Sequence, residues 1–256
     1  AESWVIDFEC GEYVLPENIH YPCYVKGLMS FHTLKKYQGK CQTESELRDK
    51  LDNIGREYPC SVIVEEFLEI DKDYGLIGFA DKNTCMVPCV VELLDGGHGS
   101  HKGVSAFGRV RQIQYGETMV EQVKNMMASM NLSGLFNIDL VESRGKIYFV
   151  EMNLRYAAYG YAVSKAGVNL PVLYIQSRLS EDTIVDTMSV IEDSYYYNER
   201  VAYDDFVFGY RSIREVNELK KKADFGLLEC AEDNKPYIRF KVGLIKLYIA
   251  HKLRKI

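Results

Sequence analysis

Three polar residues at alternate positions follow an apolar segment near the middle of the chain. The segment FVEMNLRYAAYG, residues 149–160, carries Glu151, Asn153 and Arg155 two positions apart. Because side chains two apart in a strand share a face, the three should point together if the segment is extended. An acid, an amide and a guanidinium on one face could bind a metal ion beside a phosphate. An ion pair of Glu151 with Arg155 on an ordinary strand end would use the same spacing.

A second carboxylate is expected opposite Glu151. Two apolar segments flank residues 143–146, which predicts a β-hairpin. A two-residue turn would put Asp139 and Glu151 on opposite faces, whereas a three-residue loop with Gly145 or Lys146 bulged pairs them directly. We expect the three-residue loop.

The donor atoms of this hairpin favour magnesium. Facing carboxylates repel unless a cation lies between them. Asp139, Glu151 and Asn153 offer oxygen donors without His or Cys, and such donors suit Mg²⁺, with Mn²⁺ able to substitute. Magnesium usually shares its remaining positions with phosphate, which Arg155 could hold.

Other polar residues could bind a nucleotide. Lys26 ends an apolar strand, where its ammonium could reach a phosphate, a nucleobase or solvent. In the turn EEFLEID, residues 65–71, a carboxylate could accept from an adenine amine. Asp71 or Asp73 could accept from ribose hydroxyl groups. Each feature taken alone also fits an ordinary polar surface.

A glycine-rich loop offers contacts for a second substrate. The loop GGHGSHKG spans residues 96–103, and FGRVRQI follows it. His98, His101 and Arg109 could bind an anionic carboxyl substrate, and Arg109 is the first choice. A solvated, mobile loop is the alternative for the two histidines.

Strands and helices mix without a regular βα alternation. This favours an α+β fold with antiparallel sheets. Residues 180–200 are acidic and tyrosine-rich and are expected to leave the core, and the basic amphipathic helix at 242–256 could pack or could contact a membrane or partner. The expected strands are 21–26, 61–70, two within 74–94 and two within 135–153, and the expected helices are 43–55, 117–131, one opening at Pro171, 213–224 and 242–256.

Composition limits the classes of protein to consider. The 256 residues carry a formal charge of −6, whereas a nucleic-acid binder needs a basic surface. The sequence contains no run of about 18 uncharged apolar residues, and its first residues lack the features of a signal peptide. The seven cysteines form no CxxC pair, which favours free thiols in a reducing cytosol. We therefore expect a cytoplasmic protein without nucleic-acid partners.

The order of these motifs resembles the ATP-grasp superfamily. The resemblance covers about residues 20–180 and rests on four features in a fixed order. They are a lysine at the end of an early strand, the run EEFL, an acid on one hairpin strand, and E-x-N-x-R on the next strand. The runs YVKGLMSFHTLKKYQGK and EMNLRYAAYGYAVSKAGVNLP are similar to the lid and core of carboxylate–amine ligases near cell-wall and capsule biosynthesis, which include D-aspartate ligase.

The resemblance implies a fold and a division of the chain. It implies two α+β subdomains with antiparallel sheets that grip the nucleotide between them. Residues 1–65 would be the small lid subdomain, 66–180 the C-terminal subdomain with the metal site, and 181–256 an extension that ends in the basic helix. Relatives carry a further N-terminal α/β domain ahead of this region, so a homodimer or a partner domain is expected to supply that part.

The resemblance also implies roles for individual residues. Asp139, Glu151 and Asn153 would hold Mg²⁺, and Arg155 would stabilise the transferred phosphoryl group. Those implied to contact ATP are Lys26 at the adenine or α-phosphate, Glu65 at the adenine amine, Glu66 and Leu68 through backbone groups, Asp73 or Asp71 at the ribose, and Lys35 or Lys36 at the β- and γ-phosphates. Leu154, Tyr156 and Tyr159 replace a proline and small residues of many relatives, which indicates a different acceptor pocket.

The implied activity is ATP- and Mg²⁺-dependent ligation. A carboxylate would be activated as an acyl phosphate and joined to an amine as an amide, without a protein nucleophile. A thiol or carbamate acceptor is an alternative. Another is a non-catalytic nucleotide-binding fragment, or a subunit of a split enzyme like carbamoyl-phosphate synthase.

Overall fold

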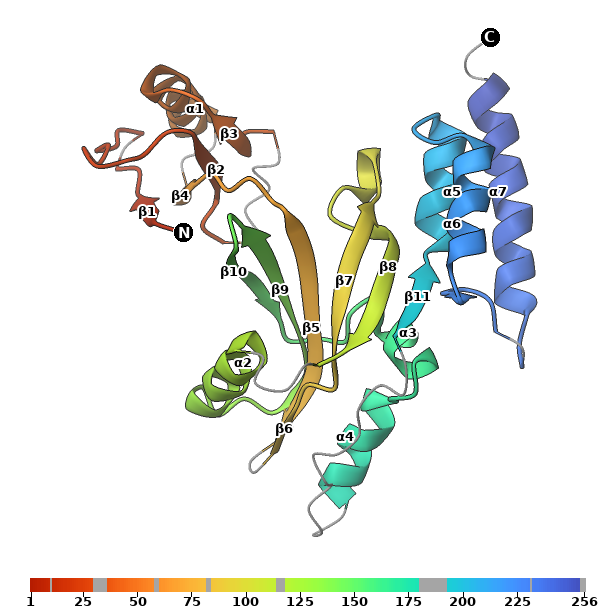
Figure 1. Cartoon of the computed structure of the whole chain (residues 1–256). Coiled ribbons are helices and arrows are strands. Elements are labelled where there is room, and N and C mark those ends of the chain that lie inside the picture. The colour runs from red at the N-terminus through yellow and green to blue at the C-terminus, as the bar shows by residue number, and fades with distance from the viewer. Residues whose placement is uncertain are drawn as a thin grey trace. The chain divides into compact units, whose positions relative to one another are not determined.

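The chain forms two compact units, Ala1–Glu69 and Ile70–Ile256 (Figure 1). The structure is a computed structural model that describes residues 1–9, 11–29, 36–57, 60–81, 84–113, 118–179, 193–230 and 232–253. Each unit has its own sheet, in which nearly all strand pairs are antiparallel, and its own apolar core, as the α+β prediction required.

The first unit is a four-stranded sheet with one helix. The sheet order is β1 (Ser3–Ile6), β4 (Val62–Glu66), β2 (Cys23–Gly27) and β3 (Gly39–Cys41). Helix α1 (Glu44–Glu57) packs its apolar face on the sheet through Leu47, Leu51 and Ile54. Thr43 accepts a hydrogen bond from the backbone N–H of Glu46 and so caps the helix.

The second unit is built on a larger sheet. Its order is β10 (Lys146–Asn153), β9 (Gly134–Ser143), β5 (Lys72–Asp81), β7 (Cys89–Gly96), β8 (Ser105–Gln112), β11 (Ser194–Tyr197) and β12 (Phe225–Gly226), and β6 (Thr84–Met86) also pairs with β5. Only the β11–β12 pair is parallel among the described strands. The segment 74–94 thus supplies three strands, where the sequence predicted two.

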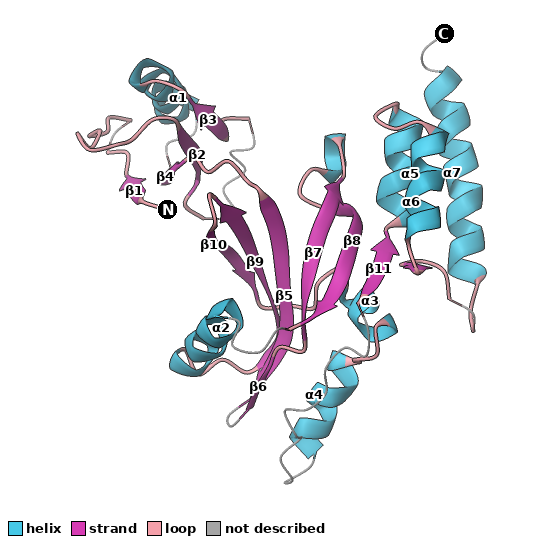
Figure 2. Cartoon of the chain, viewed as in Figure 1, coloured by secondary structure: helices cyan, strands magenta, loops and turns pink. Residues whose placement is uncertain are grey.

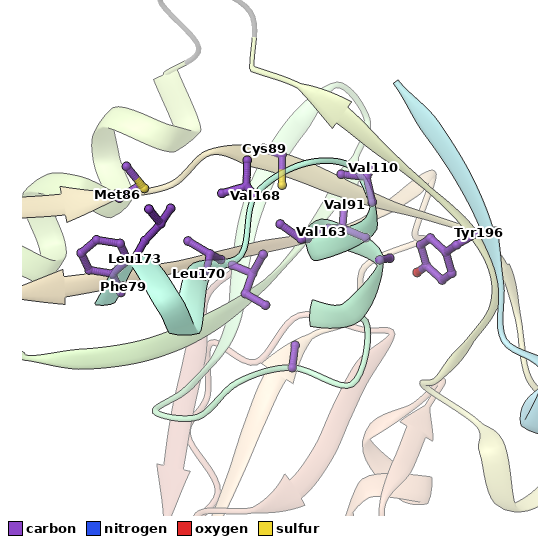
Figure 3. Packing of buried hydrophobic residues seen from close by; sticks show 14 residues of the cluster. Phe79, Met86, Cys89, Val91, Val110, Val163, Val168, Leu170, Leu173 and Tyr196 are labelled. Atoms are coloured by element: carbon purple, nitrogen blue, oxygen red, sulfur yellow. The ribbon is translucent and has the colours of Figure 1, made fainter. Parts of the chain in front are cut away.

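Helices cover both faces of this sheet. On one face, α2 (Thr118–Ser129) packs its methionine-rich side on Leu76, Ile138 and their neighbours. On the other face, α3 (Gly160–Lys165) and α4 (Leu170–Leu179) pack on Ile77, Phe79 and Val91 (Figure 3). Burial on both faces explains why β5 reads as a continuous apolar run.

The C-terminal part adds three helices beside the sheet. They are α5 (Glu199–Phe208), α6 (Ile213–Lys222) and α7 (Lys235–Leu253) (Figure 2). A Ser212 capping box starts α6, and α7 begins seven residues before the predicted 242. No helix within the described ranges is both long and apolar enough to cross a membrane.

The expectation of a surface excursion at 180–200 is wrong for its described end. Residues 180–192 lie outside the described part of the chain, but Ser194–Tyr197 form β11, an inner strand between β8 and β12. Tyr196 and Tyr197 are buried. Aromatic residues have high strand propensity, and here their burial outweighs the acidic character of the segment.

The packing of the larger sheet predicts that replacing two phenylalanines by alanine changes the stability of the fold by very different amounts. Phe79 is fully buried against α4, whereas Phe149 on β10 is 54% exposed. Phe79→Ala should lower the free energy of unfolding by about 3–5 kcal/mol because it leaves a cavity, and Phe149→Ala by less than about 1 kcal/mol. Chemical denaturation of both variants measures the difference, and equal losses would contradict this assignment of the core.

Candidate active site

The β9–β10 hairpin pairs Asp139 directly with Glu151, as predicted. The reason differs from the prediction. The turn has two residues, Arg144 and Gly145, both with positive φ (51° and 73°), instead of the expected three-residue loop. The extra residue is Val150, which bulges between Phe149 and Glu151 and shifts the register by one. The bulge moves Glu151 to the face of Asp139.

The three predicted metal residues meet on one face of the hairpin. Asn153 Nδ2 donates to Glu151 Oε1 at 3.0 Å and to Asp139 Oδ2 at 3.4 Å. Asn137, opposite Asn153, donates from Nδ2 to the other oxygen of Asp139 at 2.9 Å. Both carboxylates therefore reach one common donor atom, so a single cation could contact both.

The donor set fits magnesium. Among the described residues, no three or more His, Cys, Asp or Glu side chains could hold a metal ion by themselves. The hairpin site would therefore need the amide oxygen of Asn153 to complete Asp139 and Glu151. Two carboxylates and one amide leave the open positions that Mg²⁺ fills with water and phosphate oxygens.

Negative charge is concentrated around these residues. Burial raises the pKa of Asp139 above its ordinary value, the Asn137 hydrogen bond opposes that rise, and the Glu151 charge adds to it. Asp73 lies on the same face, because Gly75, two residues along β5, is opposite Asp139. Burial and the charge of Asp139 raise the pKa of Asp73 to about 6.

A tyrosine orders the buried side of this cluster. The Tyr159 hydroxyl donates to Asn137 Oδ1, so a hydrogen-bond chain runs from Tyr159 through Asn137 to Asp139. Tyr159 lies over Gly75, where a Cβ would overlap its hydroxyl. Burial and the charge of Asp139 also raise the pKa of Tyr159, so the hydroxyl stays protonated as a donor.

Arg155 follows the end of β10 and interacts electrostatically with this cluster. Its positive charge opposes the rise in the pKa of Asp139. It also lines a cavity of about 300 Å³, together with Met127, Leu132, Ser133, Gly134, Leu135, Phe136, Leu154 and Tyr156. Arg155 is exposed, so it is free to meet a ligand from solvent.

Comparisons with known proteins point to one fold. The family described as ATP-grasp in the biosynthetic pathway with Ter operon matches residues 101–198. L-amino acid ligase from Bacillus licheniformis is similar in structure, with a TM-score of 0.52 and 15% identity over 70% of this chain and 45% of that chain. N5-carboxyaminoimidazole synthetase from Staphylococcus aureus gives a TM-score of 0.58 and 17% identity over 79% of this chain and 51% of that chain. Its complex with ADP gives 0.56 and 16%, over 76% and 50% of the two chains.

The chain has the ATP-grasp fold. The resemblance that the sequence motifs indicated is confirmed. The chain spans about half the length of these solved structures. No curated protein sequence matches it.

Two of the residues predicted to bind nucleotide pair with each other in the first unit. Lys26 Nζ lies 2.8 Å from Glu65 Oε2, and both side chains are about one-third exposed, at 33% and 28%. The backbone N–H of Glu66 donates to Glu2, so that group is already bonded within the sheet. Leu68 is partly buried just after β4.

The predicted phosphate-covering lysines are only partly described. Lys35 lies outside the described residues. Its neighbour Lys36 is paired with Glu57 at 2.7 Å on the surface of the first unit. Asp71, the alternative to Asp73, accepts from the backbone N–H of Arg144.

Arg109 is not brought together with the metal residues. Residues opposite one another on neighbouring strands share a face, and the pairings of Asp139 with Gly75, Gly75 with Val91, and Val91 with Val110 put all four on one face. Arg109 is next to Val110 in β8, so its side chain points to the other face. There, Arg109 and Arg111 both donate to Glu92. Sequence spacing cannot show which face of an inner strand a side chain uses, and a contact of Arg109 with a substrate stays a prediction.

The two histidines of the glycine-rich loop are anchored to α5. His98 Nδ1 lies 2.9 Å from Asp205, and His101 Nε2 lies 2.9 Å from Asp204. Asp205 is almost fully buried and also accepts from Arg211. These contacts attach both histidine side chains to α5, and the role of the histidines as substrate contacts stays a prediction.

The sequence reasoning did not predict that Asn137 and Gly75 lie beside Asp139, and it linked Tyr159 only to the acceptor pocket. Asn137 lies two residues before Asp139, so alternation alone could have found it. Gly75 and Tyr159 meet only through the packing of α3 on the sheet.

Substitution of Gly75 tests how Tyr159 orders the site. In Gly75→Ala the new Cβ should displace the Tyr159 ring and break its bond to Asn137, at a cost of about 1–3 kcal/mol. Gly96→Ala on β7 is the control, because its Cβ would meet no atom within 4 Å, and it should cost less than about 0.5 kcal/mol. Equal unfolding free energies for the two variants would contradict the close contact.

The raised pKa of Asp73 predicts a pH-dependent effect on stability. Because the folded pKa of about 6 exceeds the ordinary value of 3.8, the stabilisation from protonated Asp73 is present below about pH 4 and is lost as the pH rises through 6. Compared with the natural chain in metal-free buffer, Asp73→Asn should therefore gain roughly 1–3 kcal/mol between pH 4 and pH 8.

Denaturant unfolding at both pH values checks this gain. Asp49→Asn is the control, because Asp49 is exposed on α1 and its replacement should have similar effects at the two pH values. An Asp73→Asn effect that is the same at pH 4 and pH 8 would show that Asp73 is not in the charged, buried surroundings described above.

Proposed function

We propose that the chain provides the metal and phosphate site of an ATP- and Mg²⁺-dependent ligase that joins a carboxylate to an amine. The convergence of Asp139, Glu151 and Asn153 on one face of the β9–β10 hairpin carries this proposal. Proteins with a similar fold include an L-amino acid ligase, which supports amide formation as the reaction class.

The residues of the second unit would position the phosphoryl groups. Asp139, Glu151 and Asn153 would hold Mg²⁺, which neutralises phosphate charge when it is bound. Arg155 would contact the transferred phosphoryl group with its guanidinium. Tyr159 and Asn137 would keep the Asp139 carboxylate in place through their hydrogen bonds.

The reaction itself needs no protein nucleophile. An oxygen of the substrate carboxylate attacks the γ-phosphorus of ATP, and ADP leaves, which gives an acyl phosphate. The amine then attacks the acyl carbon, phosphate leaves, and the nitrogen loses a proton as the amide forms. The protein contributes orientation and exclusion of water, since the acyl phosphate would otherwise hydrolyse.

The first unit would contact the nucleotide base. Lys26 and Glu65 form a partly buried ion pair that would open, so that Lys26 contacts the adenine or α-phosphate and Glu65 contacts the adenine amine. Glu66 and Leu68 would contribute backbone groups near the base, although the N–H of Glu66 is already bonded. Asp73 is proposed at the ribose, and Lys35 or Lys36 at the terminal phosphates.

We also propose a pathway, a cellular location and an assembly for this protein. We infer a role in cell-wall or capsule biosynthesis from the sequence resemblance, and a cytoplasmic location because the reaction consumes ATP. The six described cysteines are free, which agrees with a reducing compartment. A homodimer or a partner domain would complete the acceptor side of the site.

A second candidate function is nucleotide binding without catalysis. The chain spans about half the length of the solved structures that it resembles, so the part that binds the acceptor could lie outside it. In that case the chain would act as a subunit of a split ATP-grasp enzyme.

Replacement of Glu151 tests the metal site. Glu151→Gln keeps the shape of the side chain but removes one of two facing charges, so Mg²⁺-dependent binding of ATP should weaken about tenfold or more, as measured by calorimetry. Glu142→Gln is the matched control, because Glu142 lies on the other face of the same hairpin, paired with Lys72. It should bind ATP normally.

The assay should also follow ATP-dependent phosphate release with candidate acids and amines. Unchanged Mg²⁺-dependent binding and turnover in Glu151→Gln would contradict the proposed site. Binding of ATP that depends on Glu151, without product even when the complete assembly is used, would favour the non-catalytic alternative.

A further inference from the structure

The last described helix has two different apolar stripes. One stripe packs on α5, where Tyr203 contacts Phe240, Phe206 stacks on Tyr248, and Phe208 meets His251. Tyr237 on the same stripe is buried. These contacts hold α7 against the rest of the second unit and fix which side of the helix faces outward (Figure 1).

The outward side of α7 is also apolar. Its residues recur at spacings of four, three, four and four, as expected for one helix face, and roughly 150° of helix rotation separates this outer stripe from the packed one. Each is about half exposed or more: Ile238 52%, Val242 49%, Ile245 60%, Ile249 52% and Leu253 66%. The outer stripe is thus a continuous apolar surface that no described part of the chain covers.

Basic residues border the outer stripe on both sides. Lys241 and Lys252 lie along one edge, and Arg239 and Lys246 along the other. Residues 235–253 contain no Asp or Glu, although the whole chain carries −6. Lys241 and Lys252 lie over the rings of Tyr237 and Tyr248, which keeps their aliphatic parts beside the helix.

We propose that this face of α7 docks on an anionic lipid bilayer, with the outer stripe in the acyl region and the two basic edges at the headgroups. Such a surface offers an apolar phase and negative charge on both sides of the helix at once. A second copy of the chain would bring two purely basic helices together, and repulsion along both edges would oppose that pairing. A partner protein would need an apolar groove with acidic walls on both sides.

Vesicle binding tests this surface directly. The whole chain is mixed with phosphatidylcholine vesicles, or with vesicles that also contain about 30 mol% phosphatidylglycerol, and bound protein is measured by co-sedimentation. Binding should require the anionic lipid and should weaken as the salt concentration rises, because salt screens the basic edges.

Two double variants separate the outer stripe from charge alone. Ile245→Glu with Ile249→Glu places two acids in the stripe, and it should reduce partitioning about tenfold or more. Gly243→Glu with Ala250→Glu adds the same charges on the same helix, but outside the stripe and at exposed positions, and it should reduce binding about threefold or less. Equal helix content and unfolding midpoints show that both variants fold.

Three outcomes would overturn the proposal. One is no preference for anionic vesicles, and another is an equal loss of binding in both double variants. The third is that the natural chain does not bind vesicles but forms a concentration-dependent dimer in sedimentation velocity, and that the Ile245→Glu, Ile249→Glu variant does not form this dimer. None of these results bears on the ATP site, because α7 contributes no residue to it.

Discussion

The two facing carboxylates of the β9–β10 hairpin set the requirements that the surrounding structure has to meet. Asp139 and Glu151 are direct neighbours across the ladder, and the burial of Asp139 makes their repulsion more costly. The amides of Asn137 and Asn153 donate to them, and Arg155 adds positive charge nearby. A cation bound between the two carboxylates, as proposed, would remove the repulsion that the folded chain otherwise carries.

Rigid packing supports this arrangement from beneath. The sheet is covered by α2 on one face and by α3 and α4 on the other, so its strands have little freedom to shift. Gly75 provides the space in which Tyr159 lies, and Tyr159 orders Asn137 and, through it, Asp139. A glycine in the middle of an inner strand weakens the strand, and here the close approach of the Tyr159 ring explains its presence.

In the second unit, the carboxylates of the hairpin, the arginine ion pairs and the basic surface of α7 lie in three separate places. The carboxylates lie on the face covered by α3 and α4, whereas the ion pairs of Glu92 with Arg109 and Arg111 lie on the other. Separation by the sheet keeps these guanidinium groups from neutralising the acids that would bind metal. The basic and apolar outer surface of α7 belongs to neither face of the sheet, so the proposed contact with a bilayer would involve no residue of the proposed metal site.

The sequence by itself determined the local features of this protein. The hairpin at 143–146 and the alternation of Glu151 and Asn153 depend on residues close in the chain. The order of Lys26, EEFL, Asp139 and the E-x-N-x-R segment was enough to indicate the ATP-grasp fold. Only the tertiary structure decided where the extra residue of β10 lies, which face Arg109 uses, and that 194–197 is an inner strand. These depend on pairing and burial between segments far apart in the sequence, where a one-residue shift exchanges the two faces of a strand.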